Sequence, residues 1–102
     1  MTYRVSYSAS FLKHIDAHVD YLLGERVPID VIDDWHSRLL DRLDRLDEWP
    51  KRLPVDDVQT RLTGCETRKL NFGDYLVFYQ VDDKQRQVNI VAFRHGARRR
   101  RT

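Results

Sequence analysis

The order of apolar and polar residues predicts one strand followed by two helices in the first half of the chain. Residues 3–7 alternate apolar and polar side chains, which is the period of a strand with one buried face. Apolar residues then recur every three or four positions over residues 11–23 and 32–46, the spacing of amphipathic helices. Pro50 disfavours helical backbone at the residue before it and therefore ends the second helix. The short link between the helices predicts an antiparallel helical hairpin.

The second half of the chain is typical of a loop followed by strands. Residues 50–64 contain two prolines and several turn-forming residues, and we interpret them as a loop. Three strands are predicted after this loop, at residues 66–72, 75–81 and 87–94, with tight turns at Gly73–Asp74 and residues 82–85. The strand at residues 75–81 is apolar on both faces, so we expect it at the centre of the sheet. Leu76 or Phe78 is expected to face the helices.

The element order β-α-α-β-β-β predicts an α+β fold with two layers. Strands joined by tight hairpins must run antiparallel, so the sheet is small and mainly antiparallel. The helical hairpin can pack on only one face of so small a sheet. The opposite face is therefore expected to stay open.

Length and charge narrow the classes of protein that this chain can belong to. A chain of 102 residues predicts a single domain over residues 1–102, with a basic tail at residues 98–102. One cysteine excludes a disulfide framework, and no apolar run is long enough for a transmembrane helix, so we expect a cytoplasmic protein. Residues 1–60 carry 8 basic and 12 acidic side chains, whereas residues 61–102 carry 10 and 4. The basic half predicts an acidic or polyanionic partner, the alternative being a solvated tail.

Two sequence blocks resemble the RelE/ParE toxin superfamily of bacterial toxin–antitoxin modules, and the likeness extends over about the whole chain. They are Leu62-x-Gly64, Arg68-x-Leu70 and Gly73-Asp74-Tyr75-x-Val77-x-Tyr79-x-Val81-Asp82, and then the ending His95-Gly96-Ala97-Arg98. The resemblance implies the RelE/ParE-like fold and a toxin that inhibits bacterial growth. It implies ribosome-dependent mRNA cleavage or, as the alternative, inhibition of DNA gyrase by binding alone. A third hypothesis is a degenerate member that retains only antitoxin binding.

The candidate site is expected at the end of the sheet, where basic residues of two strands could converge. Arg68, Arg94 and His95 are the candidate catalytic residues, because RNA cleavage without a metal needs an acid or base and cations for the developing charge. The alternatives are an ion pair of Arg68 with Glu66 and a structural role for His95. Four further basic residues are candidates for binding nucleic acid or the target: Lys69, Arg98, Arg99 and Arg100.

Partners and cofactors follow from the same reasoning. The resemblance implies an acidic cognate antitoxin, a toxin–antitoxin hetero-oligomer, and either the ribosome with mRNA or DNA gyrase as the target. His14 and His18 have a spacing compatible with zinc, but the sequence offers no nearby third ligand, so we expect no metal. No other cofactor is expected, and no membrane partner.

Overall fold

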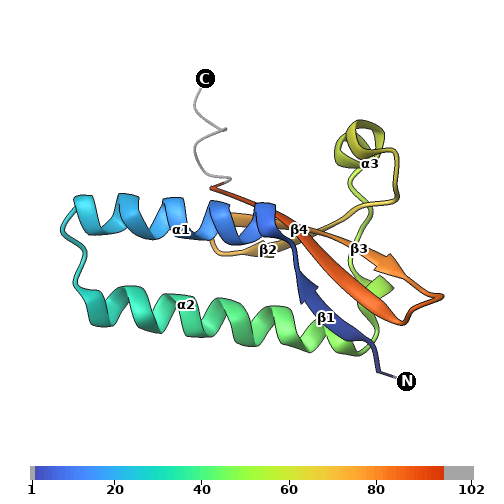
Figure 1. Ribbon diagram of the computed structural model, residues 1–102, viewed down its shortest axis with the longest axis horizontal. Helices are drawn as coiled ribbons and strands as arrows, with labels where there is room; N and C mark the ends of the chain where they lie inside the picture. The colour runs from blue at the N-terminus through green and yellow to red at the C-terminus, as the bar shows by residue number, and fades with distance from the viewer. Residues whose placement is uncertain (1, 96–102) are drawn as a thin grey trace.

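The computed structural model describes residues 2–95 and has an α+β fold in which a helical hairpin packs on one face of a sheet (Figure 1). The elements are β1 (Arg4–Tyr7), α1 (Ala9–Gly24), α2 (Ile29–Asp44), the 3₁₀ turns η1 (Arg45–Asp47) and η2 (Pro50–Arg52), α3 (Asp57–Thr63), β2 (Arg68–Phe72), β3 (Tyr75–Asp82) and β4 (Gln87–His95). Within residues 2–95, every helix is too short or too polar to span a membrane.

The two long helices begin at residues whose chemistry suits a helix start. Ser8 caps α1, and its Oγ accepts a hydrogen bond from the backbone N–H of Phe11 at 3.0 Å. Pro28 precedes α2, where its missing N–H costs no hydrogen bond. The link between α1 and α2 is short, and the two helices run antiparallel beside each other (Figure 1). The predicted helical hairpin is therefore confirmed.

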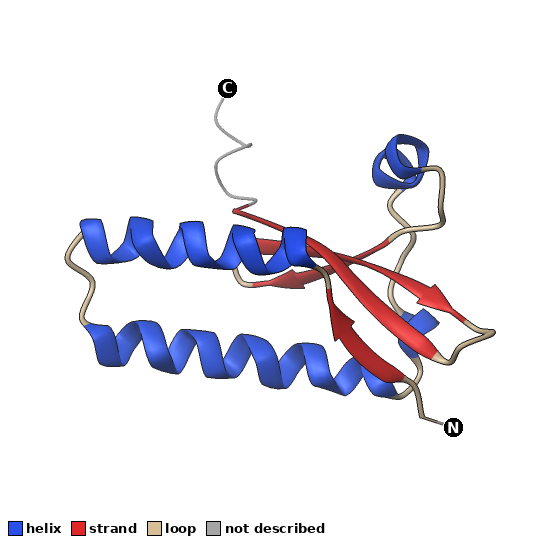
Figure 2. Ribbon diagram, viewed as in Figure 1, coloured by secondary structure: helices blue, strands red, loops and turns tan. Residues whose placement is uncertain are grey.

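The four strands form one sheet in the order β1-β4-β3-β2 (Figure 2). β1 runs parallel to β4, whereas β4, β3 and β2 are antiparallel neighbours, so the sheet is mainly antiparallel as predicted. The register of β3 with β4 shifts between Phe78, which pairs with Ala92, and Tyr79, which pairs with Ile90. Val91 is thus one extra residue in β4, a β-bulge that changes which face the following residues occupy.

The core lies between the helical hairpin and one face of the sheet. Its buried residues are Phe11, Ile15, Leu39, Leu43 and Leu46 from the helical layer and Leu70, Val77, Tyr79, Val88, Ile90 and Phe93 from the strands. The central position of β3 is confirmed. The prediction that Leu76 or Phe78 faces the hairpin is wrong, because Val77 and Tyr79 occupy that face and side chains alternate along a strand. Leu76 and Phe78 point to the opposite face.

The opposite face is partly covered by α3, which the sequence interpretation missed. Asp56 caps this helix by accepting the N–H of Gln59 at 2.9 Å, and Gly64 ends it in the left-handed conformation at φ 79°. Buried Thr67 ties α3 to the sheet, because its N–H donates to Oγ1 of Thr60 at 2.9 Å. The predicted loop at residues 50–64 is therefore a clamped segment followed by a short helix.

Candidate functional site

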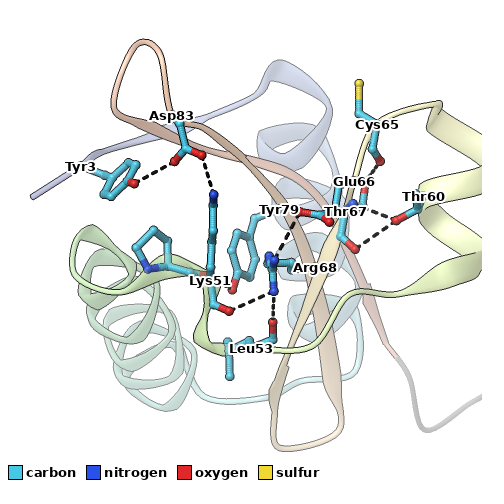
Figure 3. Close-up of polar contacts among 11 residues, drawn as sticks. Tyr3, Lys51, Leu53, Thr60, Cys65, Glu66, Thr67, Arg68, Tyr79 and Asp83 are labelled. Carbon is cyan, nitrogen blue, oxygen red and sulfur yellow. Dashed lines mark hydrogen bonds and ion pairs between the residues drawn. The ribbon is translucent and has the colours of Figure 1, made fainter.

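Arg68 holds the segment between the helical hairpin and the sheet (Figure 3). It begins β2 opposite Tyr79, on the face that carries the core. Its Nη1 donates to the carbonyl oxygens of Lys51 at 3.0 Å and Leu53 at 2.6 Å, and its Nη2 pairs with Oε1 of Glu66 at 3.2 Å. The side chain is only 13% exposed. The guanidinium is thus engaged within the chain as a backbone clamp.

Two further side chains complete this clamp. The hydroxyl of Tyr79 donates to the carbonyl of Pro50 at 2.6 Å, and this bond is buried. Nη1 of Arg52 donates to the carbonyl of Glu48 at 2.8 Å and lies 3.4 Å from that of Trp49. Burial raises the pKa of Tyr79 to about 12, against the opposing influence of Arg68 and Arg52, so its hydroxyl stays protonated at neutral pH. Every carbonyl from residue 48 to 51, and that of Leu53, therefore has a side-chain donor.

Lys69 and Arg94 lie together on the other face of the sheet. Lys69 of β2 pairs with Phe78, and Arg94 of β4 pairs with Leu76, two residues away on the same face of β3. The Arg94 guanidinium lies 5.1 Å from the centre of the Phe78 ring, and Nζ of Lys69 is 3.9 Å from a carboxylate oxygen of Asp56. We call this pocket of about 220 Å³ the open-face groove; its residues are Asp56, Val58, Gln59, Leu62, Lys69, Leu76, Phe78 and Arg94.

His95 lies on the helical face, within a group of aromatic rings. Its ring stacks on Tyr75 with centroids 4.8 Å apart, and it lies 5.7 Å from the ring of His18. Nε2 of His18 is 3.1 Å from the hydroxyl of Tyr75. Nδ1 of His14 accepts the backbone N–H of Phe93 at 3.3 Å, which fixes α1 against β4. His95 thus packs between β3 and α1 rather than standing alone on the open face.

The predicted convergence of Arg68, Arg94 and His95 is wrong. Arg94 and His95 are consecutive in β4, so their side chains point to opposite faces of the sheet. Arg68 shares the face of His95 but lies two strands away. Arg68 pairs with Tyr79 in the middle of β3, whereas His95 pairs with Tyr75 at the start of β3. Of the predicted site residues that lie within residues 2–95, only Lys69 and Arg94 lie together.

The remaining predicted site residues, Arg98, Arg99 and Arg100, lie outside the described residues. Among residues 2–95, no group of three or more histidine, cysteine or acidic side chains is placed to hold a metal ion. Sequence reasoning also missed Val58 and Leu62, which expose apolar side chains on α3 beside the basic pair. The sequence features that could have predicted the helix carrying them are the capping residue Asp56 at its start and the glycine at position 64 at its end.

The same overall fold is found in solved structures of one bacterial and one archaeal complex. The toxin–antitoxin complex RelBE2 from Mycobacterium tuberculosis contains a chain with a TM-score of 0.61 and 18% identity, and the match covers 93% of this chain and 92% of that one. The archaeal RelE–RelB complex from Pyrococcus horikoshii contains one with a TM-score of 0.60 and 22% identity, covering 96% and 99%. At these identities the likeness establishes the fold.

The family follows from the sequence itself. Residues 5–100 match the model of the ParE toxin of type II toxin–antitoxin systems, parDE. This chain belongs to that family of toxins. A comparison with curated proteins gives no significant match.

Proposed function

We propose that this toxin inhibits bacterial growth by binding DNA gyrase, without a catalytic step of its own. The observation that carries the proposal is the separation of Arg68, Arg94 and His95 described above. Metal-free RNA cleavage needs an acid or base and cations around one phosphate. Here the Arg68 guanidinium is bound to backbone carbonyls, and the sheet separates Arg94 from the imidazole of His95. This arrangement favours a binding toxin over a nuclease.

The test compares gyrase and ribosomes directly. The purified protein is assayed for inhibition of supercoiling by gyrase and for cleavage of mRNA on ribosomes, and pulse labels in induced cells record whether DNA or protein synthesis stops first. We expect inhibition of supercoiling and an early stop of DNA synthesis. Translation-dependent mRNA cleavage with unaffected supercoiling would refute the proposal.

His95→Ala separates the two mechanisms further. Loss of a general acid or base costs a nuclease about 10²–10⁴-fold in rate. In a gyrase inhibitor, the variant is expected to stay inhibitory as long as its melting temperature shows that it is folded.

Ribosome-dependent mRNA cleavage is the second candidate function, and one observation favours it. Lys69 and Arg94 lie on the same open face, where two cations can bind phosphate oxygens. Under this second candidate, Lys69→Ala and Arg94→Ala abolish mRNA cleavage.

For the antitoxin, we propose an acidic segment with apolar side chains that docks in the open-face groove, in a cytoplasmic toxin–antitoxin hetero-oligomer. The groove offers the basic side chains of Lys69 and Arg94 beside the exposed apolar side chains of Val58 and Leu62. Acidic and apolar side chains of one amphipathic segment match this combination. The solved relatives were crystallised as toxin–antitoxin complexes, which is consistent with such a partner.

The antitoxin proposal is tested by association kinetics. Exposed charges steer association less as salt shortens the Debye length, so the association rate should fall with ionic strength. The double variant Lys69→Ala with Arg94→Ala should flatten that salt dependence, whereas Lys84→Ala, in the exposed turn between β3 and β4, serves as the control. A steep salt dependence that survives in the double variant would place the docking surface elsewhere.

A further inference from the structure

Trp49 presents its ring to solvent from a backbone that is held in place. The residue is 78% exposed, the highest value among the large apolar residues within residues 2–95. Its backbone has φ 56° and ψ 50°, in the left-handed region that bulky residues rarely adopt. A residue before proline is further restricted, and Pro50 itself is buried. An exposed tryptophan at such a position requires an explanation beyond folding, because exposed surface of this kind contributes nothing to the core.

The clamp described above explains how this conformation is maintained. Arg68 donates to the carbonyls of Lys51 and Leu53, which follow Trp49 (Figure 3). Tyr79 donates to the carbonyl of Pro50, and Arg52 donates to that of Glu48, which precedes Trp49. Strained backbone of this kind persists where the surroundings over-determine it, and such sites are enriched at functional surfaces. The backbone that carries the ring is therefore held in place, so that little conformational entropy of the segment is lost when a partner binds.

A pocket of about 340 Å³ adjoins the ring and is equally fixed. Tyr3, Pro50 and Lys51 line it together with Trp49. Asp83 ties two of its walls together, since its carboxylate accepts from the hydroxyl of Tyr3 at 2.8 Å and pairs with Nζ of Lys51 at 2.5 Å (Figure 3). Ring and pocket together form a patch that offers one side chain to a partner and can receive one in return.

The chemistry of this patch suits a folded protein better than a nucleic acid. The ammonium of Lys51 is paired with Asp83, and the guanidinium of Arg52 is bound to backbone carbonyls. These two cations are thus used within the chain, and the guanidinium of Arg86 lies 5.4 Å from the centre of the Tyr3 ring. Phosphate binding needs cations that face the ligand. Tryptophan and tyrosine are, in contrast, enriched among the residues that dominate protein interfaces. The patch shares no residue with the open-face groove.

We propose that Trp49 is the anchor through which this toxin binds its protein target, with the ring buried in an apolar pocket of that target. The inference rests on the proposed binding of gyrase and names the contact that performs it. The antitoxin then occupies a different surface, the open-face groove.

The experiment compares Trp49→Ala and Trp49→Phe with the wild-type toxin and with Ile29→Ala. Ile29 is 67% exposed at the start of α2 and is the matched control for loss of an exposed apolar side chain. Binding to immobilised gyrase, inhibition of supercoiling, toxicity in cells and antitoxin binding are measured for each protein. Thermal unfolding confirms that the variants are folded.

We expect Trp49→Ala to weaken gyrase binding by about 30-fold or more, the size of a hot-spot effect. Trp49→Phe should fall between this variant and the wild type, and Ile29→Ala should match the wild type. Antitoxin binding should be unchanged in all of them. Inhibition of gyrase by Trp49→Ala at wild-type strength would overturn the proposal, as would loss of antitoxin binding with gyrase binding intact.

Failure of the proposed function is distinguishable from failure of this inference. A wild-type toxin that spares gyrase refutes the gyrase proposal by itself. In that event, toxicity in cells tests whether Trp49 contacts the target. A Trp49→Ala variant that is still fully toxic would show that the ring contacts no target.

Discussion

Replacement of Arg68 tests whether this residue holds the fold or serves the activity. In Arg68→Ala, the carbonyls of Lys51 and Leu53 lose their donor, and Glu66 loses its partner. A hydrogen bond from a charged donor contributes about 1.5–3 kcal/mol to stability. The carbonyl of Lys51 is exposed and can bind water instead, whereas the bond to Leu53 is partly buried. We therefore count one bond in full and expect a loss of about 2–3 kcal/mol.

Thermal and urea unfolding measure this loss. For a domain of about 100 residues, 1 kcal/mol corresponds to about 4–8 °C in melting temperature, so a fall of about 10–20 °C is expected. Arg68→Lys keeps the charge but lacks the second guanidinium nitrogen, which contacts Glu66, and the fixed planar geometry of the donors, so it should lose part of the same stability. Glu66→Ala is the control, because Glu66 is 62% exposed and such ion pairs contribute about 0–1 kcal/mol.

The opposite outcome would be informative. If Arg68→Ala unfolded within about 0.5 kcal/mol of the wild type, the range of an ordinary surface substitution, yet lost its toxicity, the clamp would be unimportant and Arg68 would belong to the functional surface.

The remaining predictions concern the core, alkaline pH and the strand faces. Leu70→Ala should lower the free energy of unfolding by about 2–5 kcal/mol, because Leu70 is 1% exposed in the core. Leu76→Ala, in the open-face groove, should lower it by less than half as much. Equal losses for the two variants in urea unfolding would contradict the assignment of these residues to opposite faces of the sheet. Burial raises the pKa of Tyr79 above its unfolded value of 10.0 to about 12, so the stability from its neutral form is complete below pH 10 and is lost as the pH rises towards 12. Tyr79→Phe should remove this part of the alkaline unfolding, and it should destabilise the protein at neutral pH by about 1–3 kcal/mol, because the Pro50 carbonyl is left without its donor.

Local patterns were sufficient to predict most of the elements. Alternation of apolar and polar residues identified β1, and a run that is apolar on both faces identified β3. The glycine at position 73, with φ 59°, identified the turn between β2 and β3. Helix α3 was not predicted, because none of its seven residues is buried and its sequence therefore lacks a periodic apolar pattern. Its start and end were nevertheless encoded in Asp56 and Gly64.

The candidate site was harder to predict because it depends on contacts between distant segments. The partners of Arg68 are backbone carbonyls 15 and 17 residues away, and any residue type could supply them. The same holds for Trp49, whose exposure depends on donors from three other positions. The sequence shows which segments of the chain are basic. The face of the sheet on which each basic side chain lies depends, in contrast, on strand register.

The bulge at Val91 reverses the face of the sheet to which each later residue of β4 points. Before it, Val88 and Ile90 point to the helices; after it, Phe93 and His95 do so. Unbroken alternation would have turned Arg94 inward, towards the apolar core, and His95 outward. Because of this one extra residue, the guanidinium of Arg94 is not buried in the core and lies instead on the outer face of the sheet. Chains of this family that differ only by one residue at this point would display opposite sets of side chains while keeping the same strands, so an alignment that ignores the bulge would compare residues on different sides of the sheet.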